Sequence, residues 1–147
     1  MVIGTRSTAS LAFHFWFGLT KLGIKATRIT SLTTEGYDLI NRLDPQCLVI
    51  VIGFPRYLRE WVEVVGFSKE RGLRTLTLTD SRFSPLTGDI NLYCSAESSS
   101  FIAFHCAPLI LINTIVTGLS LEDRKKTLSE LDRFERMAEA RNYFIKV

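Results

Sequence analysis

Cysteine is scarce in this chain, and the little that is present has no metal-binding or redox spacing. The three cysteines, Cys47, Cys94 and Cys106, form no C-x-x-C pair. Two of them fall in predicted strands, where cysteine behaves as a small buried hydrophobe. Together with the absence of a metal-ligand spacing between the two histidines, this leads us to expect no metal, no cofactor and a reducing, cytoplasmic setting.

A strong charge imbalance is also missing. The 18 Lys and Arg residues stand against 15 Asp and Glu residues, which leaves a formal net charge of +3. This excess is too small and too scattered to serve as the electrostatic footprint of a DNA-binding domain. We therefore expect no strong contact between this chain and nucleic acid.

The sequence shows neither a signal peptide nor a membrane span. Residues 1–3 run directly into a turn at Gly4, without the charged and then apolar pattern of a signal sequence. The longest apolar run, 101–116, is interrupted by His105 and Asn113 and is shorter than the roughly 20 residues that cross a bilayer. We predict that this run forms a buried core helix packed on a sheet, and we expect no membrane partner.

What the chain does contain is enough apolar sequence for one compact domain: 147 residues, of which 46% are hydrophobic and 22% charged. Its central stretch begins with six apolar residues, 47–52, that show no alternation. Such a run predicts a strand buried on both faces, as in a parallel sheet covered by helices. After a turn at Gly53, the residues Leu58, Trp61, Val62 and Val65 recur with helical spacing.

The same order of strand, turn and helix is repeated along the chain. Residues 1–3 predict the end of a strand, and the helix after it has an apolar face that ends at Gly23. Further strands are predicted at 25–29, 74–78 and 90–94, with a weak helix at 35–43. Five strands with helices between them predict an α/β fold, a three-layer sandwich around a five-stranded parallel sheet. The apolar face of the first helix consists of Leu11, Ala12, Phe15, Leu19 and Leu22.

A last helix is expected over residues 120–142. Ser120 to Asp123 resembles a capping box with acidic residues in the first turn. The helix that follows has a densely charged face and an apolar face, the latter made of Leu121, Leu128, Leu131, Phe134 and Ala138.

Three short phrases, read together with the strand-loop-helix units, resemble the sugar isomerase (SIS) domain carried by RpiR-type bacterial transcriptional regulators. They are Gly-Phe-Pro-Arg-Tyr at 53–57, Thr-Asp-Ser at 79–81 and Ser-Pro-Leu at 84–86. The resemblance runs from Ile3 to about Thr117. It implies a five-stranded parallel sheet between helices that binds phosphorylated sugars, as substrate or as effector. In the regulators, a separate N-terminal helix-turn-helix domain, which is absent from this chain, binds DNA.

The two phosphate loops of the family are both altered in this sequence. The first loop reads G-x-G-x-S in the family, and here Arg6 replaces the second glycine and Thr8 the serine. The second loop reads S-x-S-G-x-T, and residues 53–58 keep none of its hydroxyls. Each loop thus has an arginine where the family has glycine, and arginine is a planar donor well matched to phosphate or carboxylate.

The ligand site implied by these loops lies where the predicted strands end, because ligands of open α/β sheets bind at the carboxyl ends of strands and free helix N–H groups favour anions. Several readings stay open there. Arg6 and Arg56 either clamp an anion or pair with Asp80 or Glu97, and Tyr57 stacks on a sugar ring or packs under its own helix. The hydroxyls either donate to a ligand or cap helices. The candidate ligand-binding residues are Arg6, Ser7, Thr8, Gly53, Arg56, Tyr57, Thr79, Ser81 and Ser84.

The function these features favour is that of a non-enzymatic domain that senses a phosphorylated sugar or a related anionic metabolite. The alternatives are a sugar-phosphate aldose-ketose isomerase and a degenerate module that only dimerises. An isomerase needs a base with a pKa near 7. Glu97 and His105 are the candidates, but neither has an identifiable partner, and His14 and His105 both fit packing roles. We expect no catalytic residue.

Self-association, as a dimer or a tetramer, is also expected. The first helix has Phe13, Phe15, Trp16 and Phe17 almost all the way round, and an exposed aromatic patch usually marks an interface. The contact would involve helix 8–22, helix 121–142 or both. The alternative is that an N-terminal segment preceding this chain covers the patch.

Overall fold

A five-stranded parallel sheet forms the centre of the computed structural model, which describes residues 1–96 and 105–145. Within these residues, the strands lie in the order β2-β1-β3-β4-β5. This confirms the fold class predicted from the sequence. The strands are β1 (Val2–Ile3), β2 (Arg28–Ile29), β3 (Leu48–Ile52), β4 (Arg74–Thr79) and β5 (Ile90–Tyr93).

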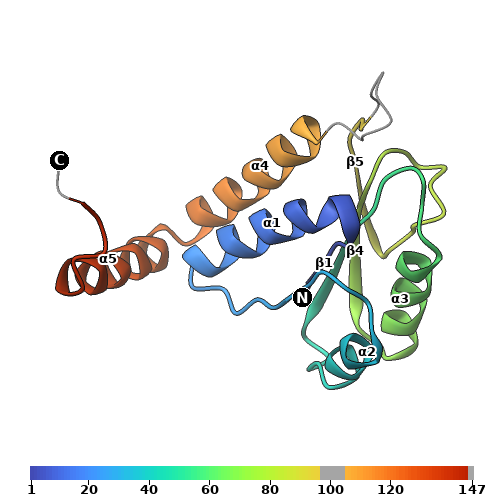
Figure 1. The fold of residues 1–147 in the computed structure, drawn as a ribbon, viewed down its shortest axis with the longest axis horizontal. Helices are drawn as coiled ribbons and strands as arrows, with labels where there is room; N and C mark the ends of the chain where they lie inside the picture. Colours follow the sequence, from blue (N-terminus) through green and yellow to red (C-terminus); the bar gives the residue numbers. More distant parts are fainter. Residues whose placement is uncertain (97–104, 146–147) are drawn as a thin grey trace.

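Helices cover both faces of the sheet. α1 and α4 lie side by side on one face, α2 and α3 cover the other, and α5 extends away from the layers (Figure 1). The short 3₁₀ helix η1 precedes α1. The helices are η1 (Arg6–Thr8), α1 (Ala9–Lys21), α2 (Thr34–Asn41), α3 (Arg59–Glu70), α4 (Cys106–Glu122) and α5 (Arg124–Ala140).

β3 is buried on both faces, as its unbroken apolar run predicted. Ile50 and Ile52 join the core beneath α1, whereas Val49 and Val51 join the core beneath α3. Successive side chains of a strand point to opposite faces, so one apolar run feeds two cores. β3 therefore holds the two helix layers together.

The apolar face predicted for α1 is confirmed, because all five of its residues are buried. Gly23 follows the helix with φ +69, a conformation that L side chains rarely adopt. In α3, Trp61 and Val65 are buried as expected, but Val62 is exposed and Val64 is buried in its place. Val64 lies three residues after Trp61 and so returns to the same side of the helix, whereas Val62 is turned about 100° from it.

The second strand is shorter than the predicted 25–29. Only Arg28 and Ile29 pair, with Val2 and Ile3 of β1. Because β1 itself has two residues, no further partner is available on this side of the sheet. Lys25 and its neighbours run as a loop instead.

The apolar run 101–116 is the least accurate of the predictions. Residues 101–104 lie outside the described part, and the helix, α4, begins at Cys106. Only Pro108 and Ile112 of α4 are buried, and Ile110 is 66% exposed. α4 packs chiefly beside α1, where a Cβ on Gly18 would lie 2.8 Å from Val116. One neighbouring helix covers one face of α4, so a helix that is apolar all round stays partly exposed.

The capping box is also placed differently from the prediction. Asp123 caps α5, and its Oδ1 accepts a 3.0 Å hydrogen bond from the backbone N–H of Lys126. Ser120 belongs to α4, and its hydroxyl donates to the carbonyl of Thr117. The chain leaves helical geometry only at Asp123, with φ −129 and ψ 72, so the cap falls there. Leu121 consequently belongs to α4 and is exposed.

Among the described residues, no single helix has the length and apolar composition of a membrane span. α4 and α5 together reach that length, but they are bent by 103° with respect to each other.

Candidate functional site

The ends of β1, β3 and β4 meet at one edge of the sheet, the edge at which α1 begins (Figure 1). Ile3 pairs with Val51, and Val51 pairs with Thr77, so the three strands end at nearly the same level. Neighbouring strands are about 4.8 Å apart, so the loops that follow them are adjacent. The predicted ligand residues lie on these three loops, which the fold thus brings together.

The loop after β1 is held tightly against the first and third helices. A Cβ on Gly4 would lie 2.6 Å from the carbonyl oxygen of Thr8, so only glycine allows this approach. The Thr5 hydroxyl donates to Oε1 of Glu60 at 2.7 Å and accepts the indole N–H of Trp61 at 3.0 Å. Thr5 therefore fixes the loop to α3.

Within that loop, Arg6 and Ser7 are exposed, whereas Thr8 is buried. The Thr8 hydroxyl donates to the carbonyl of Thr5 at 3.0 Å. Arg6 has φ +55, in the left-handed region that favours glycine. This conformation fits the glycine of the family loop that Arg6 replaces, and the loop keeps it at some strain.

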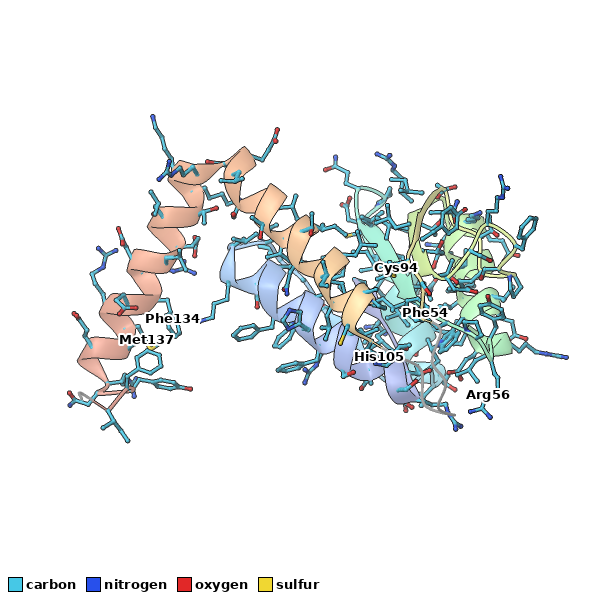
Figure 2. The ribbon with its side chains drawn as sticks, turned by 90° about the horizontal axis from the view of Figure 1, so that it is seen from above. Phe54, Arg56, Cys94, His105, Phe134 and Met137 are labelled. Atoms are coloured by element: carbon cyan, nitrogen blue, oxygen red, sulfur yellow. The ribbon has the colours of Figure 1, made fainter. Side chains whose placement is uncertain are left out.

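The loop after β3 combines a close-packed base with an exposed tip. A Cβ on Gly53 would lie 2.5 Å from the Trp61 ring and 2.9 Å from Leu86. Phe54 is buried, and Arg56 is exposed and extends outward (Figure 2). The family's serine at the position of Gly53 would therefore clash with Trp61.

The loop after β4 is organised by its own hydroxyls. Thr79 Oγ1 lies 3.1 Å from Oδ1 of Asp80 and 2.9 Å from the Ser84 hydroxyl. The Ser84 hydroxyl also accepts the backbone N–H of Leu86 at 3.1 Å. The Ser81 hydroxyl accepts the backbone N–H of Phe83 at 3.3 Å. These side chains shape the loop, as the capping alternative had it.

Tyr57 joins the second and third loops, because its hydroxyl donates a hydrogen bond to Asp80. Burial, and secondarily this bond, raise the pKa of Tyr57 above its usual range, so the phenol keeps its proton. Asp80 is engaged by Tyr57 and Thr79, and within the described residues it forms no ion pair with Arg6 or Arg56. The other proposed countercharge, Glu97, lies outside the described residues.

The arginines are the polar groups left at this edge without an internal role. Across residues 1–96 and 105–145 the sole ion pair joins Arg133 to Glu130 at 2.8 Å, so Arg6 and Arg56 have none. Sequence reasoning missed a third arginine, Arg82, which follows β4 and stacks on the exposed Phe83 ring with 5.3 Å to its centroid. Its position just after a strand end was the available signal.

His105 lies at the start of α4 with its ring 6.4 Å from that of Phe54 (Figure 2). Its Nε2 is buried and has no hydrogen-bond partner among the described residues. Burial lowers the pKa of His105, so the neutral ring is favoured. His14, by contrast, bonds Asn113 of α4 at 2.6 Å, which agrees with a packing role.

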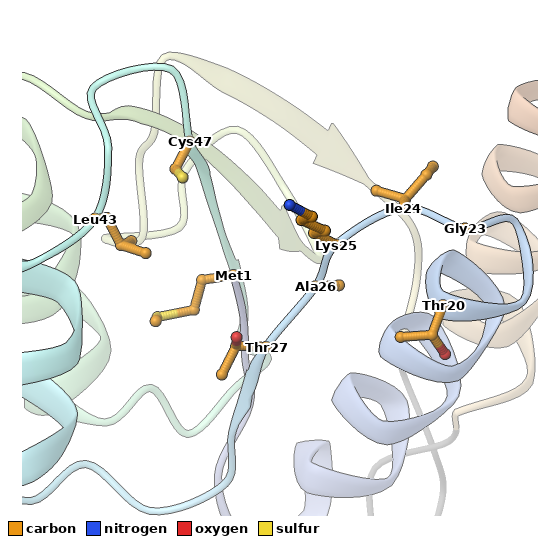
Figure 3. Close-up of a pocket in the computed structure, with 9 residues that line it drawn as sticks. All are labelled: Met1, Thr20, Gly23, Ile24, Lys25, Ala26, Thr27, Leu43 and Cys47. Carbon is orange, nitrogen blue, oxygen red and sulfur yellow. The ribbon is translucent and has the colours of Figure 1, made fainter.

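A pocket of about 520 Å³ opens at the opposite edge of the sheet, where β1 and β3 begin (Figure 3). None of the nine predicted ligand residues lines it, and Lys25 supplies its only charged side chain. Ligands of open α/β sheets bind at the carboxyl edge, so we place the candidate site there. The lining residues are Met1, Thr20, Gly23, Ile24, Lys25, Ala26, Thr27, Leu43 and Cys47.

The chain resembles known proteins in both sequence and structure. The family model of the SIS domain matches residues 1–118, and no curated protein sequence matches the chain. The sugar isomerase domain of an RpiR transcription factor from Sphaerobacter thermophilus is similar to it with a TM-score of 0.87 at 26% identity. That match covers 92% of this chain and 76% of the other.

Two further solved structures share the fold and contain a sugar phosphate. The Vibrio vulnificus NanR protein complexed with ManNAc-6P has a TM-score of 0.77 at 17% identity, covering 95% of this chain and 54% of that chain. The E. coli CFT073 protein c3406, also in complex with a sugar phosphate, has a TM-score of 0.75 at 17% identity, covering 91% of this chain and 74% of that chain.

Proposed function

This chain belongs to the SIS domain family, and on that premise we propose that it is the sugar-phosphate-sensing and oligomerisation domain of a cytoplasmic bacterial transcriptional regulator. The proposal is supported by its similarity to the RpiR transcription factor domain. It is also supported by the phosphorylated sugar in the NanR complex. DNA would be contacted by a separate domain, outside this chain.

The observation that carries the proposal is the pair of exposed arginines, Arg6 and Arg56, on adjacent loops at the carboxyl edge of the sheet. Neither has an ion-pair partner in the part of the chain that the structure describes. A guanidinium binds phosphate through two parallel hydrogen bonds and never loses its charge at physiological pH. Two of them on neighbouring loops replace donors that the altered loops have lost.

The hydroxyls of the site support a division of labour. Thr8, Thr79 and Ser84 are buried and hydrogen-bonded within their own loops. In our proposal they hold the loops in shape, whereas Arg6, Ser7 and Arg56 at the exposed rim bind the phosphate. Tyr57 contributes by keeping the second and third loops in register.

A thermal-shift screen with ManNAc-6P, a set of pentose and hexose phosphates, inorganic phosphate and the unphosphorylated sugars tests the proposal. Ligand at 100 times its dissociation constant adds about 2.7 kcal/mol of stability. We expect a phosphosugar to raise the melting temperature, and its unphosphorylated counterpart to have no effect. The shift should shrink in Arg56→Ala and persist in Arg42→Ala, an exposed arginine at the end of α2. Equal shifts in both variants would contradict the proposed site.

The isomerase alternative is favoured by one observation, the buried Nε2 of His105 at the beginning of α4, which has no partner among the described residues. A neutral imidazole is competent as a general base, provided that the substrate lies within hydrogen-bond reach. We expect no aldose-ketose interconversion of pentose or hexose phosphates. Turnover that disappears in His105→Gln or Glu97→Gln would establish the enzyme instead.

A further inference from the structure

α5 extends from the body of the domain and leaves an unusually large surface exposed. The chain has 9740 Å² of accessible surface. A compact monomer of 16.7 kDa has about 7,600 Å². The excess of about 2,100 Å² is larger than the roughly 800 Å² that each partner buries in a standard protein interface. The family model ends at residue 118, so α5 lies beyond it.

One flank of α5 combines apolar and acidic side chains. Leu128, Asp132, Glu135 and Glu139 are spaced at i, i+4, i+7 and i+11, and so form a single line, which we call the outer stripe. Leu128 is 51% exposed, and Leu131 beside it is 42% exposed. None of the three acids has an ion-pair partner within residues 1–96 and 105–145.

A second surface of the same chain has the complementary character. Phe13 and Phe17 of α1 are 46% and 45% exposed and stack with ring centroids 6.1 Å apart. The Arg28 guanidinium lies over Phe13 and over Trp16, 4.6 Å from each centroid. We call Phe13, Phe17 and Arg28 the aromatic face. The sequence has no acidic residue before Glu35, so the segments that build this face are basic or neutral.

The two surfaces do not meet within one molecule. α5 contacts its own α1 through a different flank, where Lys21 lies 3.3 Å above the centre of the Phe134 ring. Phe134 and Met137 lie on the side of α5 turned toward α1 (Figure 2). Phe134 is about 120° from Leu128 around the helix. The outer stripe therefore faces away from the aromatic face of its own chain.

We propose that this chain forms a two-fold dimer in which the outer stripe of α5 of each copy docks on the aromatic face of the other. The occupant is a second copy because the chain offers both halves of the contact, opposite in charge and both apolar at the centre. An isologous dimer makes such a contact twice. This inference rests on the oligomerisation role proposed above and supplies the surfaces that carry it.

Light scattering and sedimentation velocity of the full chain at about 10 µM test the proposal. We expect a dimer whose dissociation constant rises about tenfold or more in Leu128→Glu and in Arg28→Glu, the scale of an interface hot spot. Raising the salt from about 0.1 to 1 M, which shortens the Debye length from about 10 to 3 Å, should weaken it as well. Leu39→Glu and Arg42→Glu, on exposed positions of α2 and its end, are the matched controls and should leave the dimer intact.

A charge exchange separates the proposed pairing from other dimers. Arg28→Glu combined with Asp132→Arg or with Glu135→Arg should restore association that Arg28→Glu alone weakens. A monomer at this concentration would overturn the proposal. So would a dimer that Arg28→Glu leaves unchanged while circular dichroism shows it folded, because paired α5 helices or another surface would then be responsible.

Sensing and dimerisation fail independently in this design. The site loops lie at the edge of the sheet, whereas the outer stripe lies on α5, so monomeric Leu128→Glu should keep the thermal shift with the phosphosugar. A lost shift with an intact dimer would refute sensing alone.

Discussion

The Tyr57 hydroxyl donates a hydrogen bond to the Asp80 carboxylate, and this bond ties the loop after β3 to the end of β4. The two residues are 23 positions apart in sequence and belong to neighbouring strands of the sheet. Because Asp80 also lies within hydrogen-bond distance of Thr79, one carboxylate organises two of the three loops of the candidate site.

Tyr57→Phe removes this bond and leaves Asp80 with Thr79 alone. A hydrogen bond to a charged group contributes about 1.5–3 kcal/mol. Since Tyr57 is half-buried, we expect the lower end of that scale, a loss of about 1.5 kcal/mol in the free energy of unfolding measured with urea. Tyr93→Phe, at an exposed position of β5, is the control and should change stability little. Equal stability of Tyr57→Phe and wild type would show that the bond does not organise the loops.

Gly53→Ala should destabilise the domain by overpacking. The new Cβ would lie 2.5 Å from a ring carbon of Trp61, and overpacking a core of this kind costs about 1–3 kcal/mol. Gly66→Ala is the matched control, because Gly66 lies within α3 and a Cβ there meets nothing within 4 Å. That control should stabilise the domain by about 0.5–1 kcal/mol, since alanine is the better helix former. Urea unfolding of both variants would refute the account of Gly53 if both were stabilised.

His105 predicts a pH dependence of stability. Burial lowers its pKa in the folded state below the ordinary value of 6.5. As the pH falls through 6.5 and then through the lower folded pKa, the unfolded chain binds more protons than the folded one, so stability decreases. Unfolding curves between about pH 7.5 and 5.5 should therefore show a steeper loss in wild type than in His105→Gln. Parallel losses in the two proteins would mean that the ring takes up a proton as readily in the fold as in the unfolded chain.

The architecture followed from the sequence because its main signals are local. Six apolar residues without alternation specify a strand buried on both faces, and β3 indeed contributes to two cores. The apolar spacing of α1 likewise specifies which of its sides faces the sheet. Signals that depend on a neighbour were weaker: α4 is apolar all round, and only the position of α1 decides that Ile110 stays exposed.

The candidate site was predictable in position but not in detail. Strand ends located Arg6, Arg56 and Thr79 at one edge of the sheet, because parallel strands end together. The sequence did not reveal that the Thr79 and Ser84 hydroxyls bond each other, since that contact depends on the path of the loop. Nor did it reveal Thr5, whose bonds to Glu60 and Trp61 join positions 55 and 56 residues apart.

The central claim, that Arg6 and Arg56 bind the phosphate of a phosphorylated sugar, is tested most directly by isothermal titration calorimetry. The titrant is the phosphosugar with the largest thermal shift, and the proteins are wild type, Arg56→Ala, the double variant with Arg6→Ala, and Arg42→Ala. The account predicts about tenfold or greater loss of affinity in Arg56→Ala, a further loss in the double variant, and wild-type affinity in Arg42→Ala. Equal affinities of wild type and the double variant would contradict it.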